Sequence, residues 1–378
     1  MRFLHLADLH IGKVLHRHSL IPDQKHILNQ IFDIANSGSI DAVLIAGDIY
    51  QRSTPSPESM TVFSDFISRI AKINLPCYII SGNHDSAERI SYLSALTQKA
   101  GVFVANPKAG VVTSFPLHDA FGEITVHLLP FCNPLQIRKA YPEEADSIKT
   151  YEDAIKSVLK RYPVSGEGRH ILVAHQFLTG GQTCESEELA VGGMDNISAE
   201  LFEDYDYVAL GHLHGPQSVL RPTVRYAGSP LKYSFSEVTQ HKSVTIADVR
   251  GKGDVRIETV PLHPMHEMRE ITGLFDDLAA MSPSDDYIHA VLTDEEPPVD
   301  AHRRLRAVFP NLLHTEIRNS KLREDTFVAA QAAPEETDFL TLLRQFYAFQ
   351  NNGAEMNENQ TAIVQRLLEE TEKEVAAL

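Results

Sequence analysis

Five apolar segments of this chain each end at a small group of side chains that can ligate a metal or transfer a proton. The segments are short, rich in β-branched and aromatic residues and bounded by glycine or proline, which is typical of buried strands. They cover residues 2–8, 41–47, 75–81, 169–175 and 204–214. The polar residues lie at or just past the carboxyl end of each strand, where open α/β sheets place their functional sites. This repetition constrains the fold more than any other feature of the sequence.

Helical periodicity separates the first three strands. Residues 20–36 carry apolar side chains at helical spacing, and a second apolar face follows Pro55 and Pro57. The resulting β-α-β-α-β order predicts an α/β fold with parallel strands. Further strands are expected at residues 123–129, 223–227, 242–249 and 254–260, and a further helix at 151–161.

Four regions are expected along the chain. Residues 1–262 form the main α/β domain, and Pro261 and Pro264 mark its end. Residues 263–320 show a helix–strand–helix–strand pattern that is too small to fold alone, so we expect an α+β capping domain. Residues 321–335 are predicted to be a polar linker. Residues 336–378 are predicted to form two amphipathic helices that either bind a partner or dock on their own domain.

Charge and composition limit the class of protein without fixing its partner. The chain has 378 residues and a net charge of −17. The 29 acidic and 24 basic residues of positions 1–262 give −5, and the 22 acidic and 10 basic residues of positions 263–378 give −12. A nearly balanced main domain can still bind DNA when metal ions add positive charge, whereas the acidic C-terminal part is a poor candidate for contacting phosphate.

Cysteine usage and hydropathy indicate a cytoplasmic protein. Cys77, Cys132 and Cys184 share no CxxC spacing, so three reduced thiols are expected rather than disulfides or a thiolate metal site. Asp8 interrupts the N-terminal apolar run too early for a signal peptide, and no apolar run approaches the ~20 residues of a membrane span.

The candidate site residues provide oxygen and nitrogen ligands without sulfur. They are Asp8, His10, Asp48, Asn83, His84, Asp85, His175, His212 and His214. In an extended backbone, Asp8-x-His10 and His212-x-His214 would each place two side chains on one face. Such a set favours Mn, Fe or Zn over Ca or Mg, and two adjacent ions clamp the attacking and leaving oxygens of a phosphoryl displacement. Gly47, Gly82 and Gly211 each precede a candidate residue, which predicts sharp turns or close backbone approach.

Motifs around these residues resemble those of a known superfamily. The blocks "ADLH", "AGDI", "SGNHD", "VAH" and "GHLH" are similar to the metal-site blocks of the calcineurin-like metallophosphoesterases. The segments "DLHIGK", "GNHDS", "GHLHGPQ" and "YAGSPLKYSFSE" resemble the family of nuclease subunits of bacterial SbcCD complexes. The resemblance covers essentially the whole chain. It implies a four-layer sandwich of two mixed β-sheets flanked by helices.

The resemblance also implies a role for each candidate residue. One ion would be held by Asp8, His10 and His214. A second ion would be held by Asn83, His175 and His212, with Asp48 bridging the two. His84 would donate a proton or stabilise charge, and Asp85 would orient its ring. Some relatives carry a histidine where this chain has Gln51, so a role of that histidine in positioning a DNA end is in doubt here.

The implied activity is manganese-dependent hydrolysis of DNA phosphodiesters. It comprises 3′→5′ exonuclease activity on duplex DNA and endonuclease activity on single strands or hairpins, in recombination, replication and repair. The implied partners are a second copy of the chain and an SbcC-type ATPase, whose coiled-coil base the C-terminal helices would grip in a heterotetramer. A cytoplasmic, nucleoid-associated location follows from this assignment.

Several alternatives stay open at the level of sequence. Candidate DNA contacts are Lys13, His16, Arg17, Arg52, Arg89, Ser229 and Tyr233. The charged members are explained equally well by a solvated surface, and the loop 226–236 by a turn that closes the sheet. A small-molecule or nucleotide phosphodiesterase would use the same site without needing the cap or tail. A scaffold without activity would not need a complete ligand set.

Overall fold

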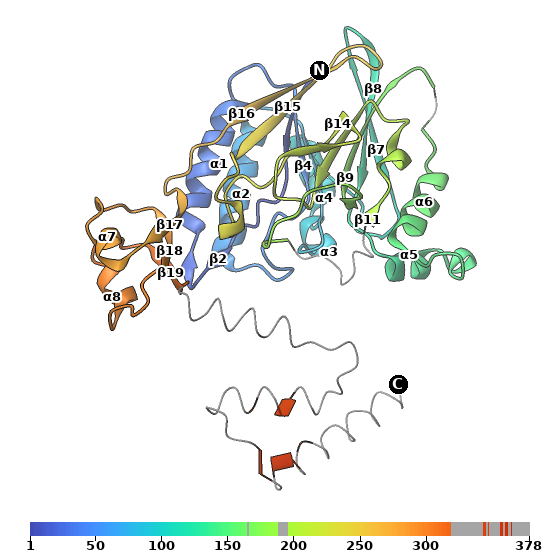
Figure 1. Cartoon of the computed structure of the whole chain (residues 1–378). Coiled ribbons are helices and arrows are strands. Elements are labelled where there is room, and N and C mark those ends of the chain that lie inside the picture. The colour runs from blue at the N-terminus through green and yellow to red at the C-terminus, as the bar shows by residue number, and fades with distance from the viewer. Residues whose placement is uncertain are drawn as a thin grey trace. The chain divides into compact units, whose positions relative to one another are not determined.

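The structure is a computed structural model that describes residues 1–164, 166–187 and 196–318, together with positions 343, 344, 347, 356, 357, 360, 361 and 364. The chain divides into two units, residues 1–291 with 299–316 and residues 292–298 with 317–378. Both six-stranded sheets described below belong to the first unit (Figure 1). The domain boundaries expected from the sequence stay predictions.

Continuous apolar runs form the centre of the first sheet. Its strand order is β16-β15-β1-β4-β5-β6. The bounds are β1 (Arg2–Leu6), β4 (Ala42–Ala46), β5 (Cys77–Ile80), β6 (Val102–Val104), β15 (Ser243–Val249) and β16 (Val255–Pro261). β1, β4, β5 and β6 are parallel, and β15 pairs antiparallel with β1. Every residue of β4 and β5 is buried, as expected for parallel strands covered on both faces.

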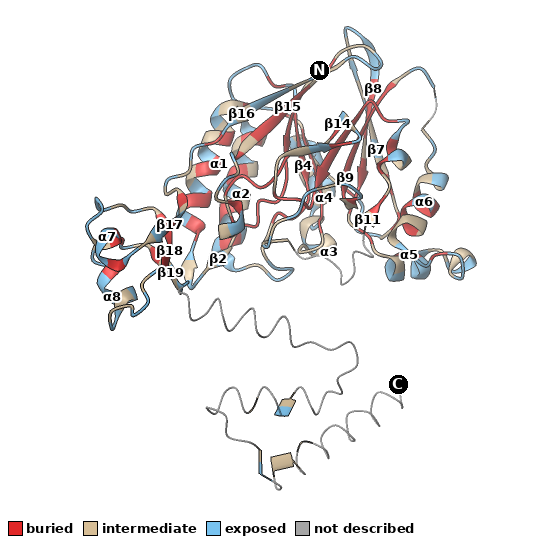
Figure 2. Ribbon diagram, in the orientation of Figure 1, coloured by how far each residue is buried: buried red, intermediate tan, exposed pale blue. Residues whose placement is uncertain are grey.

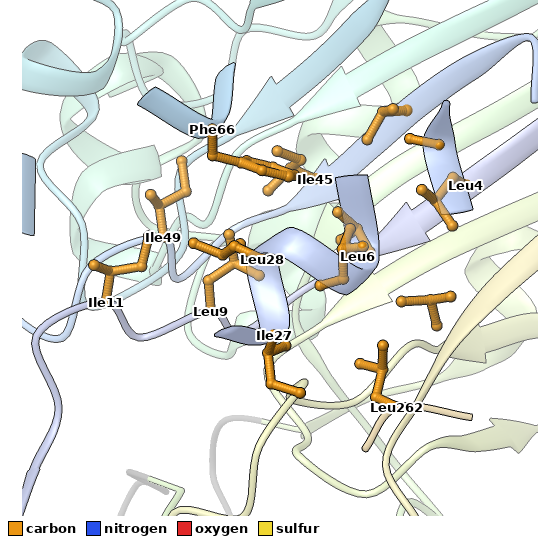
Figure 3. Packing of buried hydrophobic residues seen from close by; sticks show 14 of the residues in the cluster. Leu4, Leu6, Leu9, Ile11, Ile27, Leu28, Ile45, Ile49, Phe66 and Leu262 are labelled. Atoms are coloured by element: carbon orange, nitrogen blue, oxygen red, sulfur yellow. The ribbon is translucent and has the colours of Figure 1, made fainter. Parts of the chain in front are cut away.

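Two amphipathic helices cover the outer face of this sheet. They are α1 (Ile21–Ala35) and α2 (Pro57–Lys72). Figure 3 shows Ile27 of α1 and Phe66 of α2 in one cluster with strand residues such as Ile45. The Ser56 side chain caps α2 by accepting a hydrogen bond from the Ser59 amide, so the helix begins where the proline-flanked segment predicted it.

The second sheet has the order β13-β14-β12-β9-β8-β7. Its strands are β7 (Thr113–Asp119), β8 (Gly122–Leu129), β9 (Arg169–His175), β12 (Tyr207–Gly211), β13 (Gln217–Val219) and β14 (Arg221–Tyr226). β9 lies parallel to β8 and β12. Helices α5 (Pro134–Ala140) and α6 (Tyr151–Arg161) pack on its outer face through a buried cluster.

A third cluster fills the space between the two sheets. Phe3, Leu44 and Tyr78 of the first sheet pack there with Val126 and Val173 of the second, and all five are fully buried. Figure 2 shows buried residues concentrated in the strands of both sheets. The layers therefore run helix, sheet, sheet, helix. The predicted four-layer sandwich of two mixed sheets is confirmed.

The segment after Pro261 forms a three-stranded sheet with two short helices. Its elements are β17 (Met268–Gly273), α7 (Phe275–Ala279), β18 (Tyr287–Leu292), α8 (Ala301–Leu305) and β19 (Leu312–Ile317). The expected helix–strand–helix–strand order is present, preceded by β17, which the sequence did not predict. Asp23 of α1 accepts hydrogen bonds from the Tyr287 hydroxyl at 2.6 Å and the His266 amide at 3.2 Å. These bonds link the capping segment to the main domain.

Short elements complete the described residues. The strands are β2 (Val14–Leu15), β3 (His18–Ser19), β10 (Phe177–Leu178) and β11 (Asn196–Ile197), and the α-helices are α3 (Ala87–Ile90) and α4 (Ser94–Thr97). The 3₁₀ turns are η1 (Gln98–Ala100), η2 (Pro142–Glu144), η4 (Ala199–Phe202) and η5 (Phe235–Glu237). The linker and most of the two C-terminal helices expected from the sequence lie outside the described residues. The three cysteines are free thiols, and no helix of the described part is long and apolar enough to cross a membrane.

Candidate metal centre

The carboxyl ends of five strands, from both sheets, meet at one place. β1, β4 and β5 of the first sheet and β9 and β12 of the second each deliver polar side chains there. The residues are Asp8, His10, Asp48, Asn83, His84, His175, His212 and His214. Asn83 and His84 are half-buried and the other six are buried. The structure thus brings together eight of the nine side chains that the sequence singled out.

Asp48 lies at the middle of this cluster. Its Oδ2 is 3.6 Å from Nε2 of His10 and 3.4 Å from Nε2 of His175. The same oxygen is 3.9 Å from Nε2 of His84. One carboxylate oxygen therefore faces histidines that come from opposite sheets.

Two groups of donor atoms flank Asp48. On one side, donor atoms of Asp8, His10 and His214 lie within 4.8 Å of one another, and the two Nε2 atoms of the histidines are 3.0 Å apart. On the other side, Oδ1 of Asn83 is 3.0 Å from Nε2 of His175 and 3.1 Å from Nδ1 of His212. Donor atoms of Asp8, Asp48 and His175 also lie within 4.8 Å of one another.

The side chains fit a divalent metal. Nδ1 of His10 and Nε2 of His212 are buried without a hydrogen-bond partner among the residues that the structure describes. Protein groups alone therefore leave ring nitrogens of this cluster unsatisfied, which is rare for buried polar atoms. The donors are imidazole, carboxylate and amide, and this set suits first-row divalent ions.

The charges of the cluster lead to the same conclusion. Burial raises the pKa of Asp8 well above its usual value, with His175 opposing and Asp48 reinforcing that effect. Burial also acts on Asp48, but the positive charge of His175, and then of His10, holds its pKa well below the ordinary range. Burial lowers the pKa of His175, yet the attraction of Asp48 prevails and raises it to about 9. Two buried carboxylates side by side need a nearby cation to ionise together, and a divalent ion supplies that charge.

The backbone at the strand ends is not extended. Asp8, His10, Asp48 and His212 have φ values of +52°, +42°, +51° and +108°. The expectation that Asp8-x-His10 and His212-x-His214 reach one face through period-2 alternation is therefore wrong. The side chains converge through left-handed turns instead, each of which costs about 1–3 kcal/mol for a residue other than glycine. Strain of this kind concentrates at functional sites.

Glycine is required where the two sheets approach each other most closely. A Cβ on Gly211 would lie 2.0 Å from the Ala46 carbonyl oxygen, and one on Gly82 would lie 2.1 Å from Oδ1 of Asp48. Gly47 combines a φ of +85° with a neighbour of its own, since its Cβ would lie 2.5 Å from Nδ1 of His175. The predicted close backbone approach at all three positions is confirmed.

Replacing Gly211 by alanine is expected to destabilise the protein by about 3 kcal/mol, because the clash is with a backbone oxygen and the strands must separate. Urea unfolding followed by circular dichroism measures the change as a shift of the midpoint at constant slope. Gly251→Ala is the matched control, since its Cβ would meet no described atom within 4 Å. Equal stability of the two variants would contradict the packing argument.

Asp85 does not orient the ring of His84 as expected. Its carboxylate accepts hydrogen bonds from the backbone amides of Ile49, Tyr50 and Gly82, at 3.0–3.1 Å. Nδ1 of His84 lies 3.1 Å from the Gln51 carbonyl oxygen. Burial and then Asp48 raise the pKa of Asp85 to about 6, although the three amides oppose this. Asp85 thus joins the loops after β4 and β5, and the backbone of Gln51 takes the ring-holding role.

Two of the candidate DNA contacts are inside the protein. Ser229 is 0% exposed and Tyr233 is 1% exposed. The Tyr233 hydroxyl donates to the Leu9 carbonyl, and the Ser229 hydroxyl donates to the Leu231 carbonyl. The prediction that they line a DNA groove is wrong, because the loop folds inward. Of the remaining candidates, His16, Arg17, Arg52 and Arg89 are exposed and Lys13 is half-buried.

Sequence reasoning missed the residues that surround His214. Ser186, Glu187, Glu237 and Lys242 all hydrogen-bond to this histidine or to one another. They lie on irregular segments as single polar residues, so no periodic pattern marks them. Glu237 lies within the block "YAGSPLKYSFSE", which was the available signal.

Comparisons with known proteins agree with this geometry. A family model described as Calcineurin-like phosphoesterase matches residues 1–216. A second model, SbcD_C, described as Type 5 capsule protein repressor C-terminal domain, matches residues 264–351. The SbcD protein of Staphylococcus epidermidis, a nuclease component of SbcCD, is 30% identical over 321 residues, which cover 83% of this chain and 84% of that protein.

Solved structures align at lower identity. TT1561 of Thermus thermophilus aligns with a TM-score of 0.38 at 11% identity, covering 68% of this chain and 98% of that one. The calcineurin-like phosphoesterase YfkN from Bacillus subtilis aligns with a TM-score of 0.37 at 14% identity, covering 70% and 90%. The family assignment rests on the sequence matches, which confirm both resemblances inferred from the motifs. The chain belongs to the calcineurin-like phosphoesterases and, among them, to the SbcD family of nuclease subunits.

Proposed function

We propose that this protein hydrolyses DNA phosphodiesters as the nuclease subunit of an SbcCD-type complex. The observation that carries the proposal is the cluster around Asp48, in which six buried side chains surround one carboxylate or lie beside it and His84 stands at its half-buried edge. Membership of the SbcD family supports DNA as the substrate. The reaction would be 3′→5′ exonucleolytic on duplex DNA and endonucleolytic on single strands and hairpins.

The metal ligands are proposed from the two groups that flank Asp48. Asp8, His10 and His214 would hold one ion. Asn83, His175 and His212 would hold a second, and Asp48 would contribute to both. We propose Mn²⁺ as the ion in each position. When bound, such a pair supplies positive charge and a water of lowered pKa for phosphoryl displacement.

Backbone carbonyls orient the histidines for this task. The Ala46 carbonyl lies 2.7 Å from Nδ1 of His175 and the Gln51 carbonyl lies 3.1 Å from Nδ1 of His84. A carbonyl only accepts hydrogen bonds, so in each ring Nδ1 carries the proton and Nε2 is directed at Asp48. We propose that His84, when protonated, donates its Nε2 proton to the departing sugar oxygen.

A pocket beside the cluster would receive the DNA backbone. It is lined by Asn83, Asp85, Arg89, Lys108 and Phe131, among others. Arg89 and Lys108 are exposed. Cations at such a position neutralise phosphate charge and release counterions, which contributes affinity without sequence preference.

Removing the charges of Arg89 and Lys108 together, as the double alanine variant, is expected to weaken DNA binding equally for unrelated sequences. The slope of log affinity against log salt should fall by about 1.8, since each lost phosphate contact removes about 0.9. Fluorescence anisotropy with a labelled duplex at several salt concentrations measures both quantities. The double variant Lys99→Ala, Lys160→Ala removes the same charge elsewhere, and an equal slope change in it would contradict the pocket as a binding site.

Partners and location follow the family and are likewise proposed. The chain would form a homodimer and bind the coiled-coil base of an SbcC-type ATPase through residues 336–378, giving a heterotetramer. Work on DNA ends and hairpins during recombination, replication and repair would place it at the nucleoid.

Metal removal tests the proposal. The full chain, stripped with EDTA, should leave an end-labelled duplex and a DNA hairpin intact, and added Mn²⁺ should restore cleavage. The opposite result would be cleavage in the presence of EDTA, or hydrolysis of small phosphodiesters with no cleavage of DNA by the chain or by its complex with the ATPase. Deleting residues 336–378 is the companion experiment. It should abolish ATPase binding, whereas a small-molecule phosphodiesterase would lose nothing.

A further inference from the structure

His214 is held at every polar atom except the one that faces the candidate metal centre. Its backbone amide donates to Oε1 of Glu187 at 2.6 Å, and its carbonyl accepts from Nζ of Lys242 at 2.9 Å. Its Nδ1 lies 2.6 Å from the hydroxyl of Ser186. Nε2 alone faces the cluster, 3.0 Å from Nε2 of His10. The residue is therefore fixed both in position and in ring orientation.

A buried ion pair lies behind the serine. Glu237 is 0% exposed and Lys242 is 6% exposed, and Nζ of the lysine is 2.6 Å from Oε2 of the glutamate. The other oxygen of Glu237 accepts from the Ser186 hydroxyl at 2.6 Å and from the Tyr233 amide at 3.1 Å. A carboxylate among these donors, one of them an ammonium group, is ionised and acts only as an acceptor.

The ion pair determines the direction of the hydrogen bonds. The hydroxyl of Ser186 has a single proton, and Glu237 can only accept it. Towards His214 the same oxygen must then accept, so Nδ1 of the ring carries its proton. Nε2 is left with a free lone pair pointing at His10. That is the tautomer in which a neutral imidazole can bind a metal through Nε2.

We propose that Glu237 and Lys242 act through Ser186 as positioning residues that hold His214 in the Nδ1-protonated tautomer for metal binding. The inference rests on the proposed function only in taking His214 as a metal ligand. A buried ion pair contributes little net stability compared with apolar side chains, so stability alone gives weak reason for one here. Outer partners of ligating histidines typically change metal affinity about 10- to 100-fold.

Three variants test the chain of hydrogen bonds. Ser186→Ala removes the link, and Glu237→Gln offers the serine an amide that can donate and so reverse the bond. Each should weaken the tighter Mn²⁺-binding step by about 10- to 100-fold, measured by isothermal titration calorimetry on the full chain. Ser186→Thr keeps the hydroxyl at a half-buried position, and it should restore affinity to within about threefold of the parent.

The tautomer itself is read without any metal. In metal-free protein labelled with ¹⁵N-histidine, the His214 ring nitrogens should report Nδ1 protonated in the parent and in Ser186→Thr. Ser186→Ala and Glu237→Gln should shift the proton towards Nε2. Asp119→Asn weakens the ion pair with buried Arg169 at the far end of β9, so it controls for a general loss of stability and should change neither measurement.

The proposal is overturned if Ser186→Ala keeps both the parent's Mn²⁺ affinity and its His214 tautomer. It is also overturned if Ser186→Thr loses affinity as far as Ser186→Ala does, because the hydroxyl would then be irrelevant. Neither readout depends on DNA cleavage. Absence of nuclease activity with these shifts intact would count against the proposed function and leave the positioning role standing.

Discussion

Replacing Asp48 by asparagine is expected to lower the rate of DNA cleavage by about a thousandfold or more. The substitution keeps the size of the side chain and the oxygen that accepts the His84 amide at 2.9 Å, but it removes the negative charge between His10 and His175. A metal pair contributes several kcal/mol to charge stabilisation in the transition state, and about 4 kcal/mol corresponds to a thousandfold in rate. Single-turnover cleavage of a labelled duplex measures the loss.

The same variant should bind less metal. Plasma mass spectrometry of gel-filtered protein is expected to find about two Mn²⁺ per parent chain and fewer than two per Asp48→Asn chain, because the carboxylate shared by both positions is gone. Asp119→Asn, which neutralises a carboxylate paired with Arg169 in the second sheet, is the matched control and should retain both ions. Full metal content in Asp48→Asn with activity lost would show that Asp48 does not bind the ions.

The positions of the site residues were predictable because they depend on long-range order that hydrophobic patterning encodes. The run Ala42–Ala46 is apolar throughout, so it had to be a strand buried on both faces, and parallel neighbours had to bring their carboxyl ends together. Asp48, Asn83 and His175 then follow at that edge without further information. Gly211 carried equally clear information, because a residue without a side chain next to a ligand pair indicates close packing.

The local conformations were not predictable in the same way. His212 adopts a φ of +108°, which its intrinsic preference disfavours, and surrounding contacts such as the bond from its amide to Asp8 hold it there. The loop with Ser229 and Tyr233 looks like an exposed turn by composition. It is buried because Lys242 and the Leu9 carbonyl satisfy its polar groups, and these partners are distant in sequence. Tertiary hydrogen bonds of this kind leave no periodic signal.

Replacing His84 by glutamine is expected to separate chemistry from metal binding. Nε2 of His84 lies 3.9 Å from Oδ2 of Asp48, farther than the corresponding atoms of His10 and His175, and its ring is half-buried at the edge of the cluster. A residue that donates a proton typically contributes about 100- to 10,000-fold to the rate. The variant should lose that factor in single-turnover cleavage and retain the metal content of the parent. His118→Gln, whose side chain is 71% exposed, should match the parent in both.

The leaving group distinguishes proton donation from a general disturbance of the site. A nitrophenyl ester of a nucleotide departs as a stable phenolate and needs little protonation, whereas a sugar alkoxide needs a great deal. His84→Gln should therefore lose much less activity on the nitrophenyl ester than on DNA. Asp48→Asn should lose comparable activity on both, because charge stabilisation at phosphorus is needed whatever group departs. If His84→Gln is impaired equally on the two substrates, the histidine acts on the phosphate or on DNA placement and the departing oxygen takes its proton from elsewhere.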